Sequence, residues 1–199
     1  MPFPEIDASM LPLVSDIADI PDDLDINYEE ECFFLRVPIA ASECGRWLVT
    51  IDVGWREYEA QSPCPGVKPL DFVMFGYEIT AFDQVDSVLY QTMDPREARC
   101  GIPEEVRPLV VEIACECYER LICECDPEYI YRVTWIEEPG ENALNKHTKA
   151  TETLTQAGYS VVMDGTDKHG CKFWLLGKSD ADHSNLEQPE LDDQLGAEP

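Results

Sequence analysis

Four cysteines lie close together in this chain, and closely spaced cysteines are the residues that most often bind structural zinc. Cys115 and Cys117 form one C-x-C pair, and Cys123 and Cys125 form a second. On a helix, however, residues two apart point to different faces, and structural zinc sites more often use C-x2-C spacing. The nine cysteines are an odd number, unlike a secreted disulfide framework. We therefore expect reduced, mostly buried thiols, no metal site and a cytoplasmic protein.

The sequence carries none of the local catalytic signatures. It has no H-E-x-x-H, G-x-S-x-G or G-x-x-x-x-G-K-[ST] motif. Of its three histidines, His147 falls on the apolar side of an expected helix and is predicted to be a packed residue rather than a ligand. A Cys–His nucleophilic pair need not be local in sequence and stays open as an alternative. We predict no catalytic residue and no cofactor, so the chain is more consistent with a binding protein than with an enzyme.

The few basic residues of the second half are clustered. They lie on an expected helix and in an expected hairpin loop: Lys146, His147, Lys149, Lys168, His169 and Lys172. A basic cluster of this kind suits a phosphate-bearing ligand. Charge balance on an exposed face also explains it, and this is the interpretation we favour.

Glutamates recur on one side of an expected helix. Glu105, Glu112, Glu116 and Glu119 are separated by seven, four and three residues. With 3.6 residues per turn they fall in one stripe, and a rise of about 1.5 Å per residue spaces them by roughly 5–10 Å. This spacing resembles that of phosphates along a DNA strand, so the stripe predicts a DNA-mimicking surface. The alternative is an ordinary solvated helix face.

The acidic bias extends well beyond that stripe. The chain has 41 acidic and 14 basic residues and a formal net charge of -27. Ten acids fall in 1–31 and seven in 179–199, and neither end contains Lys or Arg. Such a field repels nucleic acid and anionic membranes and attracts basic protein surfaces. We expect Asp22, Asp23 and Asp25 to contact such a partner, with Trp55 as an exposed interface aromatic.

The remaining pattern predicts one α+β domain with a mostly antiparallel sheet and two main helices packed on it. The domain spans 32–178, between a flexible acidic arm at 1–31 and a disordered acidic tail at 179–199. The arm contains enough apolar residues to lie on the domain or on a partner. The expected strands are 32–39, 46–53, 71–80, 129–136, 159–163 and 171–176, and the expected helices are 103–125 and 142–157.

From Asp71 onward, this order of elements weakly resembles the second half of the GCN5-related acetyltransferase fold, in which strand, helix, strand and helix precede a final hairpin. That family holds the coenzyme A pyrophosphate with an Arg/Gln-x-x-Gly-x-Gly/Ala turn before its main helix. Here the turn between Arg96 and Ile102 contains only Gly101, the helix opens with Pro103-Glu-Glu, and the second helix has no tyrosine. The resemblance therefore implies a shared fold with a degenerate cofactor site, and no catalytic residue is carried over.

Together these observations predict a non-enzymatic acidic protein that binds the basic, nucleic-acid-binding surface of another protein or nucleoprotein complex. A phage- or plasmid-encoded inhibitor of a defence nuclease, acting as an anti-CRISPR or anti-restriction DNA mimic, fits this composition. Two alternatives remain at this point. One is a divergent acetyltransferase-like or ligand-binding protein, and the other is an antitoxin or immunity protein.

Overall fold

A computed structural model of the chain describes residues 3–29, 32–57, 72–94, 96–134, 140–166, 170–181, 183 and 186. At a few positions inside strands and helices, among them Trp55, only the backbone is described. The predicted acidic tail at 179–199 lies almost wholly outside the described residues.

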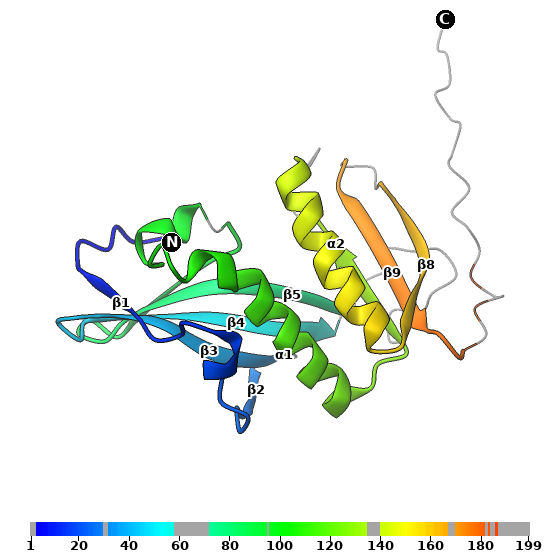
Figure 1. Cartoon of the computed structure of the whole chain (residues 1–199), viewed down its shortest axis with the longest axis horizontal. Coiled ribbons are helices and arrows are strands. Elements are labelled where there is room, and N and C mark those ends of the chain that lie inside the picture. Colours follow the sequence, from blue (N-terminus) through cyan, green and yellow to red (C-terminus); the bar gives the residue numbers. More distant parts are fainter. Residues whose placement is uncertain are drawn as a thin grey trace, which may run out of the picture.

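Strands form the centre of the molecule (Figure 1). Within the described residues, nine strands join one sheet in the order β1-β3-β4-β5-β7-β9-β8, with β2 added beside β3 and β6 beside β5. Their bounds are β1 Met10–Pro12, β2 Ile26–Glu29, β3 Cys32–Ser42, β4 Trp47–Glu57, β5 Phe72–Asp83, β6 Val88–Thr92, β7 Tyr129–Val133, β8 Tyr159–Thr166 and β9 Lys172–Lys178. The predicted α+β class with a mostly antiparallel sheet is confirmed.

One strand pair departs from the antiparallel pattern. β5 and β7 run parallel, and their register spans only Phe72–Met74 against Tyr129–Tyr131. A parallel pair needs a crossover connection, which here contains the first main helix. This short seam joins the strands β1 to β6 to the strands β7 to β9.

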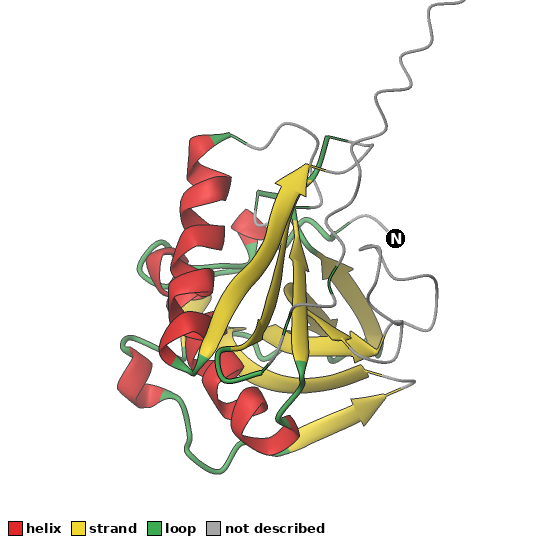
Figure 2. Ribbon diagram, turned by 90° about the vertical axis from the view of Figure 1, so that its right-hand side faces the viewer, coloured by secondary structure: helices red, strands yellow, loops and turns green. Residues whose placement is uncertain are grey.

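The two main helices are α1, Val110–Cys125, and α2, Glu141–Gln156. They lie on the same side of the sheet (Figure 2). Alternate residues of the strands point toward them, and Val49, Ile51 and Ile79 are fully buried there. α1 contributes Ile113 and Leu121 to the same core, at the spacing expected of one helix face.

The start of α1 differs from the prediction. The sequence pattern places it at Pro103, but the segment before Val110 forms tight turns, among them the short 3-10 helix η4, Arg107–Leu109. Pro103 and Pro108 have no backbone N–H, and backbone bonds run from Val106 N to the Pro103 carbonyl and from Leu109 N to the Val106 carbonyl. Glu105 therefore lies in a turn, and its predicted place in the helical stripe is wrong.

The N-terminal segment takes the first of its two expected positions and lies on the domain. β1 and β2 both pair with β3. Ile6, Val14 and Ile20 are buried in the main core. Between β1 and β2, the 3-10 helix η1, Ile17–Asp19, begins with a capping box formed by Asp16 and Asp19.

Candidate partner-binding surface

Helix α1 presents carboxylates on the side opposite its buried face. Glu119 is exposed, whereas Glu112 and Glu116 are half-buried. These three residues keep the stripe predicted from the sequence, without Glu105. Because the buried residues of α1 face the sheet, the stripe points outward between α2 and η1.

Arg120 connects this stripe to the N-terminal segment. Its guanidinium donates to the Glu116 carboxylate, 3.1 Å away, and to the Pro21 carbonyl. The Asp22 carboxylate lies 3.8 Å from the same guanidinium. The two acidic segments that the sequence singled out separately are therefore neighbours. We call them together the acidic surface, which consists of Asp22, Asp23, Asp25, Glu112, Glu116 and Glu119.

Two cations neutralise part of this surface. Arg120 pairs with Glu116, and Lys149 of α2 pairs with Glu112 at 2.8 Å. Asp22 is fully exposed, so its contact with Arg120 is weak. Asp23, Asp25 and Glu119 are exposed and have no ion pair among the described residues. The unneutralised charge of this surface is therefore that of Asp23, Asp25 and Glu119, together with the weakly paired Asp22.

Trp55 does not join this surface by any described contact. Its backbone lies in β4, in register with Phe75 of β5. The position of its side chain is outside the described part of the chain, so its role as an interface aromatic stays a prediction.

The predicted basic cluster is only partly assembled in the described residues, and Lys168 and His169 lie outside them. Lys149 forms an ion pair with Glu112. His147 packs against Trp174 with ring centroids 5.1 Å apart, as its predicted packing role requires. Burial, and secondarily the charges of Arg132 and Lys146, lowers the pKa of His147 to about 4. The imidazole is therefore neutral near pH 7 and adds no positive charge.

Arg132 is a feature that sequence reasoning missed. It lies in β7, only 5% exposed, and its guanidinium donates to the His147 carbonyl and to the Thr151 hydroxyl. Its Nε has no hydrogen-bond acceptor among the described residues. A cation inside an apolar strand run, Tyr-Ile-Tyr-Arg-Val, was the available signal, because an isolated buried charge is costly.

A shallow groove of about 510 Å³ lies beside this arginine, between α2 and β8. Trp174, Thr151 and Val161 line it, together with the carboxylates of Glu152 and Asp164. Two carboxylates disfavour a phosphate at this place, contrary to the phosphate-ligand alternative for the neighbouring basic residues.

The paired cysteines of α1 lie in different environments. Cys115 and Cys117 are buried, and Cys123 is exposed. Burial raises the pKa of Cys117 to about 12 and that of Cys125 to about 11, so both favour the thiol over the metal-binding thiolate. All seven cysteines whose side chains are described are free, but the prediction that they are mostly buried is wrong, because only Cys115 and Cys117 are buried among them. The described residues contain no group of three or more His, Cys, Asp or Glu side chains placed to hold a metal ion.

Comparison with protein-family models, with curated proteins and with solved structures found no match to this chain. Among the described helices, none has the length and apolar character needed to cross a membrane.

Proposed function

We propose that this chain is a non-enzymatic binding protein whose acidic surface docks on the basic, nucleic-acid-binding surface of another protein. The observation that carries the proposal is the contact of Arg120 with both Glu116 and the segment Pro21–Asp22. This contact makes one continuous surface from two acidic segments. Carboxylates there take the places that nucleic-acid phosphates would occupy, and the partner's site is occluded.

The ion pairs within the acidic surface oppose the binding of a partner only weakly. Exposed pairs such as Lys149–Glu112 contribute little stability and can exchange partners at small cost. The free carboxylates of Asp23, Asp25 and Glu119 attract the partner first. For the biological role, we propose a phage- or plasmid-encoded inhibitor of a defence nuclease. An antitoxin or immunity protein would act in the same way, and only the identity of the partner distinguishes the two.

The experiment is a pull-down with the tagged chain from its native host at low and high salt. We expect a basic nucleic-acid-binding protein to be captured at roughly 50 mM salt and largely released at roughly 500 mM, because salt screens exposed charges. The purified partner should also lose nucleic acid when the chain is added.

The test variant neutralises Asp22, Asp23, Asp25 and Glu119 by conversion to Asn or Gln. The control neutralises four exposed carboxylates elsewhere, Glu128, Glu141, Glu152 and Asp180, and so changes the net charge equally. Loss of capture by the test variant alone supports the proposal. Equal loss in both variants, or capture that does not respond to salt, contradicts it.

A second candidate is the acetyltransferase-like alternative, which the arrangement of β5, α1, β7, α2 and the β8–β9 hairpin supports. The turn before α1 still argues against a pyrophosphate there, since Glu104 and Glu105 are exposed in it and Glu112 stands in the first helical turn. Calorimetric titration with coenzyme A tests this candidate, and we expect no heat of binding.

A further inference from the structure

The sheet has a second face, which points away from α1 and α2. Residues paired across neighbouring antiparallel strands point to the same face of a sheet. Leu11 pairs with Ala41, Ala41 with Leu48, Leu48 with Phe82, and Phe82 with Leu89. One row of apolar side chains therefore crosses β1, β3, β4, β5 and β6. We call these five residues the apolar row.

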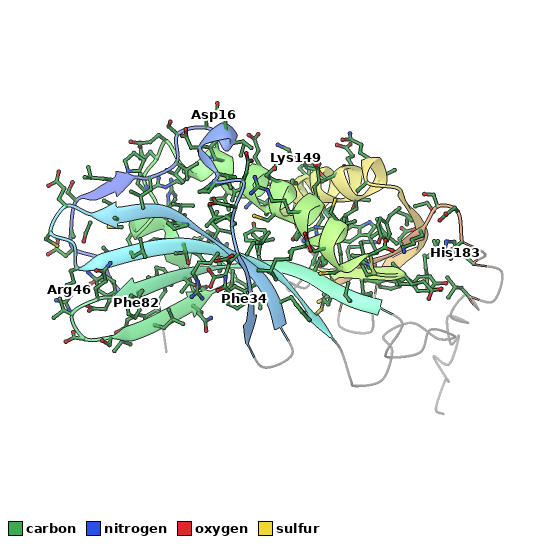
Figure 3. The ribbon with its side chains drawn as sticks, turned by 90° about the horizontal axis from the view of Figure 1, so that it is seen from below. Asp16, Phe34, Arg46, Phe82, Lys149 and His183 are labelled. Carbon is green, nitrogen blue, oxygen red and sulfur yellow. The ribbon has the colours of Figure 1, made fainter. Side chains whose placement is uncertain are left out.

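The row lies on the face opposite the main core. Its neighbours in sequence, among them Val49 and Ala81, are fully buried beneath the helices, so the row itself must point the other way. Figure 3 looks onto these strands, with Phe82 labelled on β5. Within the described residues no helix covers this face, and Leu11 and Leu89 are 47% and 41% exposed.

Leu11 and Leu89, at the two ends of this row, are exposed apolar side chains. Among the described residues, six large apolar side chains are exposed. Leu13 and Met93 are also exposed, and each directly follows the end of a strand that carries the row, β1 and β6 respectively. Scattered surface leucines need no explanation, but a continuous group of them marks an interaction site.

The charges around the row select its occupant. In the segments that adjoin β1 and β3, Asp7 and Glu43 are exposed and have no ion pair among the described residues. Arg46 is shared between Asp83 and Asp86, which leaves that group with one net negative charge. An apolar centre inside an acidic rim is complementary to an apolar patch with a basic rim. A second copy of this chain, with its net charge of -27, is repelled instead.

We propose that the apolar row is a second docking surface, which binds an amphipathic basic segment of a protein partner with its apolar side chains against Leu11, Leu48, Phe82 and Leu89. This surface is separate from the acidic surface and adds contacts that salt does not screen.

Two synthetic helical peptides of equal length and equal positive charge test this proposal. One combines Leu with Lys and the other combines Ser with Lys, and binding to the full chain is measured by fluorescence anisotropy. We expect the Leu–Lys peptide to bind at least about tenfold more tightly, since its leucines become buried. The difference should persist in high salt. Equal affinities for the two peptides overturn the proposal.

Substitution locates the binding. The double variant Leu11→Gln, Leu89→Gln should remove the advantage of the Leu–Lys peptide, and both residues are exposed enough for the fold to tolerate the change. The control is Val161→Gln, which alters an apolar residue of 42% exposure on β8. Equal loss in the control overturns the proposal.

Sedimentation of the chain tests whether a second copy occupies this surface instead. A dimer that the variant Leu11→Gln, Leu89→Gln dissociates would overturn the proposal. The four-carboxylate variant that tests the acidic surface should weaken the binding of both peptides by the same factor. The failure of one proposal can therefore be distinguished from the failure of the other.

Discussion

Arg132 and Arg36 are two arginines of the same sheet in opposite electrostatic situations. Arg132 is buried beside Tyr118, with its guanidinium 5.9 Å from the ring, and its described hydrogen-bond acceptors are neutral. Arg36 instead makes a two-pronged contact with Asp52, whose side chain is only 4% exposed. Burial lowers the pKa of Arg132, as expected for a cation removed from water.

We expect Arg132→Met to leave the free energy of unfolding unchanged or to raise it by about 1–2 kcal/mol, because an apolar side chain of similar length removes an uncompensated buried charge. Arg36→Met should lower it by about 2 kcal/mol or more, since it leaves the Asp52 carboxylate buried without its cation. Urea unfolding measures both. A clear loss of stability in Arg132→Met would mean that its bonds to His147 and Thr151 outweigh the cost of burial.

His147 makes stability depend on pH. Its pKa falls from 6.5 to about 4 on folding, mainly through burial, so the unfolded chain binds a proton in that window and the folded chain does not. The contribution is fully present above pH 6.5 and is lost as the pH falls toward 4. We expect the free energy of unfolding to fall by about 2 kcal/mol over this range, less than the full pKa shift would give because the ring is partly exposed to solvent. Urea unfolding of wild type and His147→Phe at several pH values measures it, and parallel pH profiles of the two proteins would contradict the assignment.

At the scale of elements, β4 and β5 each carry a glycine, and the two are paired in register. A Cβ on Gly54 would meet the carbonyl oxygen of Phe33 and lie 2.7 Å from Cβ of Phe34. A Cβ on Gly76 would meet no atom of the described structure within 4 Å. Only one of the two positions therefore requires glycine for space.

We expect Gly54→Ala to destabilise the chain by about 2 kcal/mol through overpacking. Gly76→Ala should be neutral or stabilising by up to about 1 kcal/mol, because alanine restricts the unfolded chain. Thermal unfolding of the two variants side by side provides the measurement. Equal effects would show that β3 and β4 do not approach each other this closely.

Local sequence patterns predict most of the helices and strands, but they do not predict the features that depend on contacts between residues distant in the chain. Alternation and β-branched residues located β3, β4 and β5, and Asp126 ends α1 as predicted, in a left-handed conformation. The start of α1 differs from the predicted Pro103, because the two prolines 103 and 108 lack a backbone N–H and the segment up to Leu109 forms tight turns. The pairing of β1 and β2 with β3 was not predictable, since short strands acquire their partners from register rather than from their own residues.

The same limit applies to the candidate sites. The spacing of Glu112, Glu116 and Glu119 predicts the stripe. The contact of Arg120 with Asp22, which connects the stripe to the N-terminal segment, follows only from the three-dimensional structure. The apolar row contains one residue from each of five strands and has no linear signature. Surfaces built across strands follow from pairing, which periodicity along the chain does not reveal.

At the scale of the whole molecule, an excess of negative charge opposes the compact state. We expect the free energy of unfolding to increase by about 1 kcal/mol or more as NaCl rises from roughly 0.01 M to 0.1 M, because the Debye length falls from about 30 Å to about 10 Å. The four-carboxylate variant of the acidic surface should show a smaller increase. Stability that is independent of salt would mean that the described ion pairs already balance the field.

We expect the short parallel seam between β5 and β7 to set the order in which this chain folds. The β3–β4–β5 meander and the β8–β9 hairpin connect strands that are adjacent in sequence, so their contacts are closer along the chain than those of the seam. Phe72 and Tyr129 stand far apart in the chain and meet only after α1 has crossed over the sheet. Because loop-closure entropy opposes contacts between residues distant in the chain, we expect that meeting to be the slow event of folding and the two portions of the sheet to form as kinetically distinct units. If the transition state contains the seam, substitutions there slow folding more than equally destabilising ones at the far end of the meander, which stopped-flow refolding of the two kinds of variant measures.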